Sequence, residues 1–273
     1  MQLVVVGTGL MGGSFALAAR QQALFQRIVG IEPDPERRRR ALDLELVEAV
    51  AESVPDDADA VLLAGPSHTI APWVARLAGH PGVVFDTGSV KRAVLDEVRA
   101  ELGSLPGRFV PCHPLAGSEL SGPEAADGAL FRDAEVIVTP AVETDADALR
   151  QVEGWWRAVG ARVSAMTAEE HDRVLALTSH LPHLLVFTYL QLVEDGHLEH
   201  TAGGFRDFTR IGASDAGMWA PIFRLNRGAV LAALDDLEGE LRRVRGLIEA
   251  ADDVGLGEFL RAAARRRGGI RGR

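Results

Sequence analysis

Residues 2–13 read QLVVVGTGLMGG, and this stretch decides the fold class of the 273-residue chain. The apolar run Leu3 to Val6 predicts a short buried strand, and Gly7-Thr8-Gly9-Leu10-Met11-Gly12 follows it where a helical pattern begins. A G-x-G-x-x-G between a strand and a helix is typical of dinucleotide binding, because glycine lets the backbone approach a pyrophosphate at the helix N-terminus. These six residues are therefore the first candidate cofactor contacts.

Glu32 completes this pattern, because an acidic residue is expected about 20 positions after the glycines, at the end of the second strand. Its carboxylate would accept hydrogen bonds from ribose hydroxyls and repel a 2′-phosphate. This favours NAD, although Arg37 nearby could accommodate the extra phosphate of NADP.

Strand-like and helix-like segments alternate up to about residue 165. Apolar runs predict strands over 27–31, 60–64, 83–85, 109–112 and 135–138, with a further edge strand at 162–164 and helices over 14–20, 90–102 and 145–159. This alternation predicts an α/β, Rossmann-type, mostly parallel sheet with helices on both faces.

Helical periodicity replaces the strands after residue 165. Thr167 and Glu170 form a capping box at the start of a long helix, Pro182 inside that helix predicts a kink, and 225–250 reads as another long helix. We expect a dinucleotide-binding domain over residues 1–165 and an all-helical domain over 166–273.

Composition excludes several classes of function. A formal net charge of −10 argues against nonspecific nucleic-acid binding, and the four arginines at 37–40 read as a solvated helix face. The sequence has no apolar run of about 18 residues, so a membrane span is not expected. Met1 leads directly into the first strand, and Cys112 is the only cysteine, which together predict a cytoplasmic protein without signal peptide or internal disulfide. The Arg-rich residues 265–273 read as a frayed tail.

Further candidates follow the later strands. The carboxyl ends of parallel strands meet at one edge of a sheet, where ligands bind. Pro66, Ser67 and Thr87 are expected to contact the cofactor there, with Ser89 and His113 beside them as catalytic residues and Lys91 as a substrate contact. Lys91 is the only lysine, which indicates either a role for a compact ammonium or chance.

His113 is the candidate acid–base residue. A neutral imidazole can take a proton near pH 7, as the oxidation of an alcohol requires, and Ser89 could hold the same oxygen. Taken alone, a histidine between Cys112 and Pro114 reads as a structural loop residue.

The helical region carries candidates for substrate binding. His180 and His183 share a helix face but lack cysteine or carboxylate partners, so substrate contact or packing is favoured over a metal site. Arg210 is either a carboxylate clamp or the surface ion-pair partner of Asp207, and Trp219 lines a pocket or belongs to the core.

Taken together, these residues resemble the prephenate/arogenate dehydrogenase family of tyrosine biosynthesis. The match is carried by residues 7–14, 86–91, 113–122, 171–183 and 204–219, in the family's order. The resemblance implies NAD(P)-dependent oxidative decarboxylation of prephenate to 4-hydroxyphenylpyruvate, or of arogenate to tyrosine. It also implies a homodimer formed through the helical domain.

The resemblance further implies a role for each matching residue. His113 would bind the substrate hydroxyl with Ser89 beside it, and Arg210 would bind a substrate carboxylate. His183 would be a further substrate contact, with Asp207 and Trp219 near the site. The chain length leaves no room for the chorismate mutase or ACT domains of many relatives, so feedback through such a domain is not expected.

Two other classes remain open. A reductase of the 3-hydroxyacid dehydrogenase type has a similar architecture but uses a lysine on an interdomain helix, whereas Lys91 is expected in a loop. A non-catalytic dinucleotide sensor would bind NAD without turnover and would not need His113.

Overall fold

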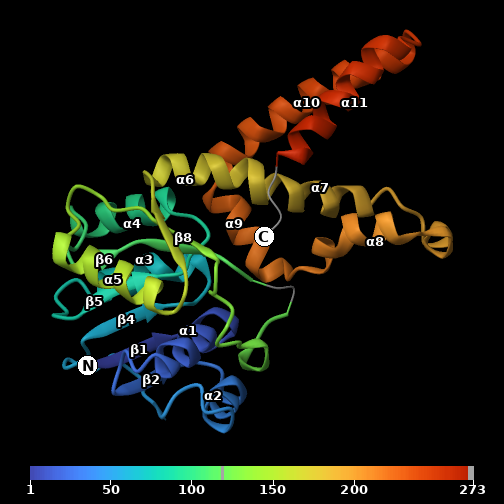
Figure 1. The fold of residues 1–273 in the computed structure, drawn as a ribbon. Coiled ribbons are helices and arrows are strands. Elements are labelled where there is room, and N and C mark those ends of the chain that lie inside the picture. The colour runs from blue at the N-terminus through green and yellow to red at the C-terminus, as the bar shows by residue number, and fades with distance from the viewer. Residues whose placement is uncertain (118–119, 270–273) are drawn as a thin grey trace. The chain divides into compact units, whose positions relative to one another are not determined.

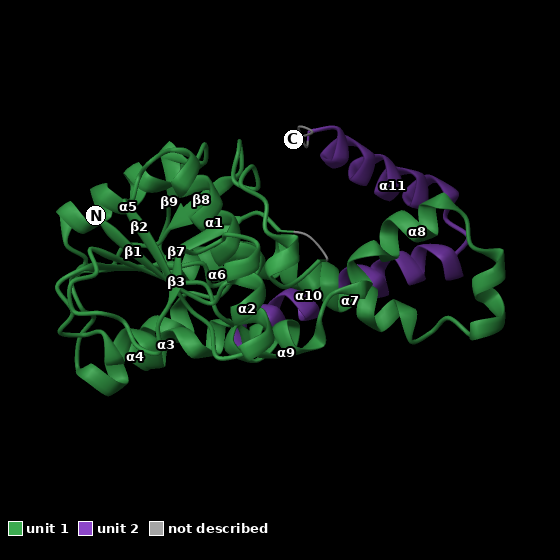
Figure 2. Cartoon of the chain, turned by 90° about the horizontal axis from the view of Figure 1, so that it is seen from below, with its two compact units in different colours: residues 1–227 green, residues 228–273 purple. Residues whose placement is uncertain are grey.

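The computed structural model describes residues 1–117 and 120–269 (Figure 1). Ser118 and Glu119, which belong to the motif at 113–122, and residues 270–273 of the tail lie outside the described residues. The chain divides into two compact units, residues 1–227 and 228–273 (Figure 2). The domain boundary expected at residues 165 and 166 marks the change from strands to helices and stays a prediction. The helices between residues 166 and 227 belong to the first compact unit.

The first unit is built on a six-stranded parallel sheet. Its strands are β1 (Gln2–Val6), β2 (Arg27–Ile31), β3 (Ala49–Val50), β4 (Ala60–Leu63), β5 (Val83–Asp86) and β6 (Phe109–Val110), in the order β3-β2-β1-β4-β5-β6. Every neighbouring pair is parallel. The strands β1 to β3 are added toward one edge of the sheet, and the strands β4 to β6 are added on the other side of β1. The strand order therefore switches between β1 and β4, and at such a switch point a crevice that binds ligands opens at the carboxyl ends of the strands. The predicted Rossmann-type fold is confirmed, although the short strand β3 was not predicted.

Strand residues alternate between two apolar layers. Leu3 and Val5 of β1 join a cluster with α1 (Leu10–Gln21) and α5 (Ala146–Ala158), whereas Val4 and Val6 join a cluster with α3 (Ser67–Arg76) and α4 (Arg92–Leu102). Both faces are covered by helices, so the four residues from Leu3 to Val6 are all apolar rather than every second one. Helix α2 (Pro35–Asp43) follows β2.

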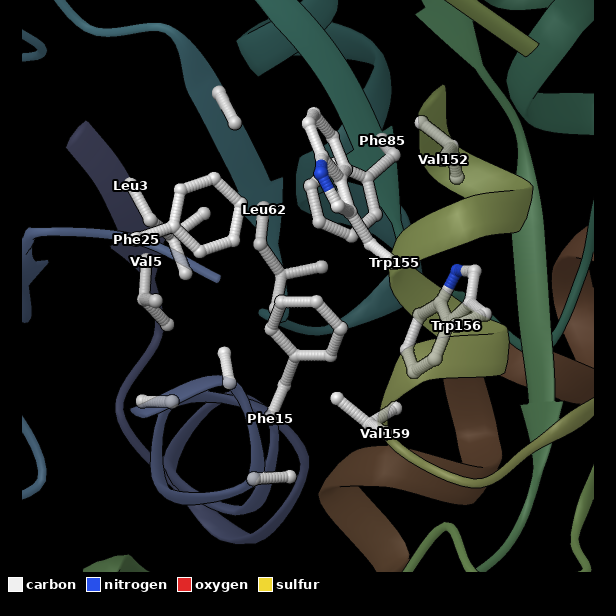
Figure 3. Close-up of a cluster of buried hydrophobic side chains, with 14 of the residues drawn as sticks. Leu3, Val5, Phe15, Phe25, Leu62, Phe85, Val152, Trp155, Trp156 and Val159 are labelled. Atoms are coloured by element: carbon white, nitrogen blue, oxygen red, sulfur yellow. The ribbon is translucent and has the colours of Figure 1, made fainter. Parts of the chain in front are cut away.

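Aromatic rings fill the first of these layers. The Phe15 ring packs edge-on against Trp156 with 4.8 Å between centroids, and Phe85 lies 5.4 Å from Phe15. Figure 3 shows the side chains of α1 and α5 meeting over Leu62 and Phe85. This layer fixes α1, and therefore the glycine loop, against the sheet.

A second, three-stranded sheet differs from the prediction. The expected strand 109–112 is divided by Pro111 into β6 and β7 (Cys112–Leu115). Strand β7 pairs antiparallel with β8 (Glu135–Val138), which pairs parallel with β9 (Arg162–Ala165). Proline lacks a backbone N–H for a ladder, so the strand changes sheets there. As a result β8 does not extend the main sheet. The short helix η1 (Pro123–Ala125) lies in the β7–β8 connection.

The helical segment after β9 begins at the predicted cap. The Thr167 hydroxyl accepts a hydrogen bond from the Glu170 backbone N–H at 3.1 Å, and α6 (Ala168–Leu175) follows. A π-helical turn, η2 (Ala176–His180), then leads into α7 (Leu181–Leu190), with Pro182 in its first turn. The irregularity expected at Pro182 is therefore a widened turn that precedes it, because proline fits a first turn but not a helix interior.

Four further elements complete the first unit: η3 (Asp195–His200), α8 (Gly203–Thr209), η4 (Arg210–Ala213) and α9 (Ala216–Leu225). The second unit consists of α10 (Arg227–Glu249) and α11 (Asp253–Gly268), joined by a cation–π contact of 5.6 Å from Arg243 to Phe259. Helix α11 runs through the first arginines of the expected frayed tail, so that prediction is wrong up to Gly268. Along the described part of the chain, no helix combines the length and apolar character needed to cross a membrane.

Candidate active site

The glycine loop has the shape that a dinucleotide needs. Gly7 has φ +91°, and a side chain on Gly12 would collide with the Gly7 carbonyl and lie 2.7 Å from Val5 Cγ1. At Gly9 the space that a Cβ atom would fill is open, with no atom within 4 Å. Helix α1 starts at the next residue, so its unpaired N–H groups lie beside this open backbone. The loop therefore fits a pyrophosphate.

Glu32 joins this loop to the end of β2. Its carboxylate is 6 % exposed and accepts hydrogen bonds from the backbone N–H groups of Thr8 and Asp34, each at 3.2 Å. These bonds hold a negative charge next to the glycine loop, in the place where a ribose would be recognised. The donor and acceptor set of these residues therefore fits the adenosine half of NAD.

The loops after β4 and β5 lie against each other. Ser67, which is buried, accepts a hydrogen bond from the Ser89 N–H at 3.2 Å through its hydroxyl oxygen. Thr87 is also buried, Ser89 is half-buried, and Pro66 is exposed at the N-terminus of α3. The structure thus brings together the two loops expected to line the cofactor crevice.

Lys91 is a buried residue whose side chain is bonded to other protein groups. Its side chain is 1 % exposed, and its ammonium donates to the Asp86 carboxylate and, at 2.6 Å, to the Cys112 carbonyl. Asp86 also accepts from the N–H groups of Gly88 at 2.8 Å and Cys112 at 2.9 Å. This buried ion pair ties the end of β5 to the start of β7. Substrate contact by Lys91 stays a prediction that these contacts do not favour.

Cys112 is a packing residue, fully buried in the core. Burial, together with the nearby Asp86 carboxylate, raises the pKa of its thiol far above the usual value, so no thiolate forms at neutral pH. The backbone of Cys112 is bonded to both Asp86 and Lys91, and His113 is the next residue. The buried ion pair therefore also fixes the position of the His113 imidazole.

His113 contacts a second buried imidazole. His113 Nδ1 lies 2.8 Å from His171 Nε2, and His171 Nδ1 lies 2.7 Å from Asp172 Oδ1. Burial lowers the pKa of His113 well below 6.5, and the neighbouring His171, Lys91 and His180 lower it further. Burial also lowers the pKa of His171, against the opposing effect of Asp172. Both rings are therefore neutral at neutral pH.

Asp172 holds α6 against the loop of Lys91. Its Oδ1 accepts from the Lys91 N–H and its Oδ2 from the Arg92 N–H, each at 2.9 Å. It thereby caps the N-terminus of α4 from a distant helix. Asn226 donates to the Asp172 carbonyl at 2.8 Å and lies 3.0 Å from His180 Nδ1, which ties the end of α9 to the same region.

His180, His183 and Trp219 form a packed aromatic group. His183 stacks on Trp219 with 3.7 Å between ring centroids, and His180 meets the same indole edge-on at 6.0 Å. His180 is 1 % exposed, and burial lowers its pKa to about 4. Among the described residues, His180 Nε2 and Trp219 Nε1 have no hydrogen-bond partner.

Arg210 lies in η4, which packs against the helix α7 that carries His183. Burial lowers the pKa of His183, and the positive charge of Arg210 lowers it further. His183 Nδ1 donates to the Ser179 carbonyl at 2.8 Å, so its Nε2 faces away from the helix backbone. Arg210 and Asp207 are exposed. The structure thus stacks His183 on Trp219 and packs the element of Arg210 against the helix of His183, whereas a place for Asp207 near the substrate stays a prediction.

His171, Asp172 and Asn226 were not assigned roles from the sequence. Asp172 reads there as an ordinary residue of the first turns of a helix, and His171 was part of a matching stretch without a function. The available signal was an adjacent His-Asp pair in a helix that already carried His180 and His183. Within the described ranges, no group of three or more His, Cys, Asp or Glu residues is placed to hold a metal ion.

Comparisons with known proteins agree with this arrangement. The family model of the prephenate dehydrogenase nucleotide-binding domain matches residues 15–165, and that of the prephenate dehydrogenase dimerization domain matches residues 167–262. A cyclohexadienyl dehydrogenase of Zymomonas mobilis is 34% identical over 92% of this chain and 89% of its own length. A prephenate dehydrogenase of Bacillus subtilis is 33% identical over 98% of this chain and 76% of its own length.

A solved structure extends the likeness to three dimensions. The prephenate dehydrogenase of A. aeolicus, in complex with hydroxyphenyl propionate and NAD+, has a TM-score of 0.92 and 33% identity, covering 99% of this chain and 98% of that one. Sequence models, relatives and fold therefore agree over nearly the whole length. The chain belongs to the prephenate dehydrogenase family.

Proposed function

We propose that this chain oxidises and decarboxylates prephenate to 4-hydroxyphenylpyruvate, with NAD as the hydride acceptor. The observation that supports this most directly is the neutral, buried imidazole of His113 in the compact unit that also holds the glycine loop and Glu32. Because the chain belongs to the prephenate dehydrogenase family and has both a candidate base and a dinucleotide-binding loop, it is an NAD-dependent oxidoreductase.

Each residue of the site has a chemical task in this reaction. Bound NAD supplies the electrophilic ring that takes the hydride from the carbon bearing the hydroxyl. His113 accepts the hydroxyl proton, and Ser89, in the loop after β5, orients the same oxygen. Arg210 binds a substrate carboxylate bidentately, and His183 and Trp219 form the wall beside it. The cation is needed because the chain is acidic overall and prephenate is a dianion.

The cofactor site favours NAD over NADP. The Glu32 carboxylate accepts hydrogen bonds from two backbone N–H groups, and these bonds hold it in place beside the position of the ribose. A 2′-phosphate at that position would meet a fixed negative charge.

The assembly is inferred to be a homodimer. The dimerization-domain model matches residues 167–262, which include α10 and α11 and several exposed apolar side chains on them, such as Leu241, Ile248 and Leu260. We also infer a cytoplasmic location, because the single buried cysteine forms no disulfide within the chain.

An assay of two substrates against two cofactors tests this function. Purified protein with prephenate and NAD is expected to produce NADH and carbon dioxide, with a lower rate with NADP. A faster reaction with arogenate would make the chain an arogenate dehydrogenase, the second candidate. NAD binding without turnover of either substrate would instead indicate a dinucleotide sensor.

The Arg210→Ala variant tests the carboxylate clamp. We expect the KM for prephenate to rise by about 10–100-fold, because one charge-assisted pair contributes about 1.5–3 kcal/mol, while kcat changes less. Steady-state kinetics measure both constants. Arg206→Ala is the matched control, since Arg206 is an exposed arginine of the preceding helix. An unchanged KM in Arg210→Ala would remove this residue from substrate binding.

A further inference from the structure

The bonds around His113 determine which of its nitrogens carries the proton. Three donors surround the Asp172 carboxylate: the N–H groups of Lys91 and Arg92 and the His171 ring. Both oxygens of this carboxylate already accept a backbone N–H, and a carboxylate has acceptor oxygens only. His171 must therefore donate from Nδ1 to Asp172, and in a neutral ring its Nε2 then carries a lone pair.

The same argument passes from His171 to His113. The contact of 2.8 Å between His113 Nδ1 and His171 Nε2 needs one proton, and His171 Nε2 has none to give. His113 Nδ1 is thus the donor. A neutral His113 with a proton on Nδ1 has its lone pair on Nε2, the nitrogen on the other side of the ring.

We propose that His171 and Asp172 are positioning residues that fix the tautomer of His113 with Nε2 as the proton acceptor. This rests on the proposed function, in which His113 takes the proton of the substrate hydroxyl. Neither residue touches the substrate in this scheme, and both act only through the imidazole of His113.

The proton returns to the product within one turnover. The hydroxyl O–H bond breaks and an N–H bond forms at His113 Nε2, while the electrons of the C–H bond leave with the hydride to NAD+. The bond to the carboxylate then breaks, carbon dioxide leaves, and its electron pair completes the aromatic ring. His113 gives the proton back to the phenolic oxygen, so prephenate and NAD+ yield 4-hydroxyphenylpyruvate, carbon dioxide and NADH with no net proton change.

His113 carries a positive charge only between these two steps. Three groups face His113: His171, Lys91 and His180. Among them, the Lys91 ammonium disfavours a positive charge on His113. Asp172 is the carboxylate linked to His113 by hydrogen bonds, through His171, and Asp86 also faces His171. The chain of bonds to Asp172 thus stabilises the transient imidazolium as well as the resting tautomer.

Histidine-selective nitrogen NMR of the full-length protein without substrate tests the tautomer directly. The chain has eight histidines, and the variants His113→Gln and His171→Gln assign the two signals. We expect the proton on Nδ1 in both rings near pH 7. A proton on Nε2 of His113 would overturn the proposal, whatever the enzyme assay shows. If instead the assay is silent and both rings carry Nδ1 protons, the function fails and the positioning stands.

A pair of substitutions tests the effect on turnover. The His171→Gln amide can donate to Asp172 and accept from His113, whereas His171→Phe can do neither. We expect His171→Phe to lower kcat by about 10–100-fold, the range for loss of a group that orients a functional imidazole, with KM for prephenate little changed. His171→Gln should recover most of the loss.

The exposed His197→Gln is the matched control and should leave kcat and the NMR signals of His113 unchanged. Wild-type kcat in His171→Phe, or equal losses in the Phe and Gln variants, would contradict the proposal. If His171→Phe does not fold, the tautomer measurement on the wild-type protein still decides the question.

Discussion

Replacing His113 with asparagine is expected to lower kcat for prephenate by about 10²–10⁴-fold, the range for loss of a general acid–base residue. An asparagine amide N–H can take the place of His113 Nδ1 and keep the bond to His171, but no atom replaces Nε2. The substitution therefore removes the proton acceptor while preserving the packing around it. NAD affinity should change little, because the glycine loop and Glu32 follow β1 and β2 of the main sheet, whereas His113 lies in β7 of the second sheet.

Steady-state kinetics and fluorescence titration with NADH measure the two effects. The wild-type pH profile provides an independent check, since only the neutral imidazole accepts a proton. Burial holds the pKa of His113 well below 6.5 in the free enzyme, so kcat/KM should stay level as the pH falls through 6.5 and decline only at lower pH. Turnover in His113→Asn within a few-fold of wild type would exclude His113 as the base.

Replacing Lys91 with methionine is expected to lower the free energy of unfolding by about 3–5 kcal/mol, because breaking a buried ion pair leaves an uncompensated charge. Asp86 is 0 % exposed, and without the ammonium it keeps only the N–H groups of Gly88 and Cys112. Methionine fills a similar volume, so the loss is electrostatic more than steric.

Urea denaturation measures this loss, with Arg92→Met as the matched control. Arg92 is the neighbouring cation, but its side chain is 58% exposed and its ion pairs are on the surface, so its removal should cost less than about 1 kcal/mol. The opposite result for Lys91→Met, unchanged stability with a raised KM for prephenate, would indicate that Lys91 binds the substrate as the sequence suggested.

The main sheet could be predicted because all of its strands except the short β3 are apolar runs that can be recognised from the local sequence. The run Leu3 to Val6 and the glycines after it define β1 and the turn that follows. The division at Pro111 could not be predicted in the same way, since β7 finds its partner β8 some 20 residues later in the chain. Such long-range pairing depends on tertiary contacts that no short window of sequence contains.

Site residues at strand ends were easier to identify than those on helices. Glu32 follows β2 and His113 follows the predicted strand 109–112, and the geometry of a parallel sheet predicts that such positions gather at one edge. In the structure His113 lies inside β7, the strand that begins directly after Pro111. His171 and Asp172 lie inside a helix, where their partners are set by packing. Lys91 was prominent as the only lysine, yet Asp86, which decides its role, had been read only as the end of a strand.

The π-helical turn at Ala176–His180 makes residue count matter in this helix as well as residue type. Each residue of a regular α-helix advances about 100° around the axis, and a π-turn accommodates one extra residue. Deleting a single residue inside the turn would restore ordinary helical bonding and keep His183 near its place relative to His171, whereas deleting a residue outside the turn would rotate His183 by about 100°. The π-turn therefore lets the helix carry one more residue between these histidines than a regular helix would at the same geometry.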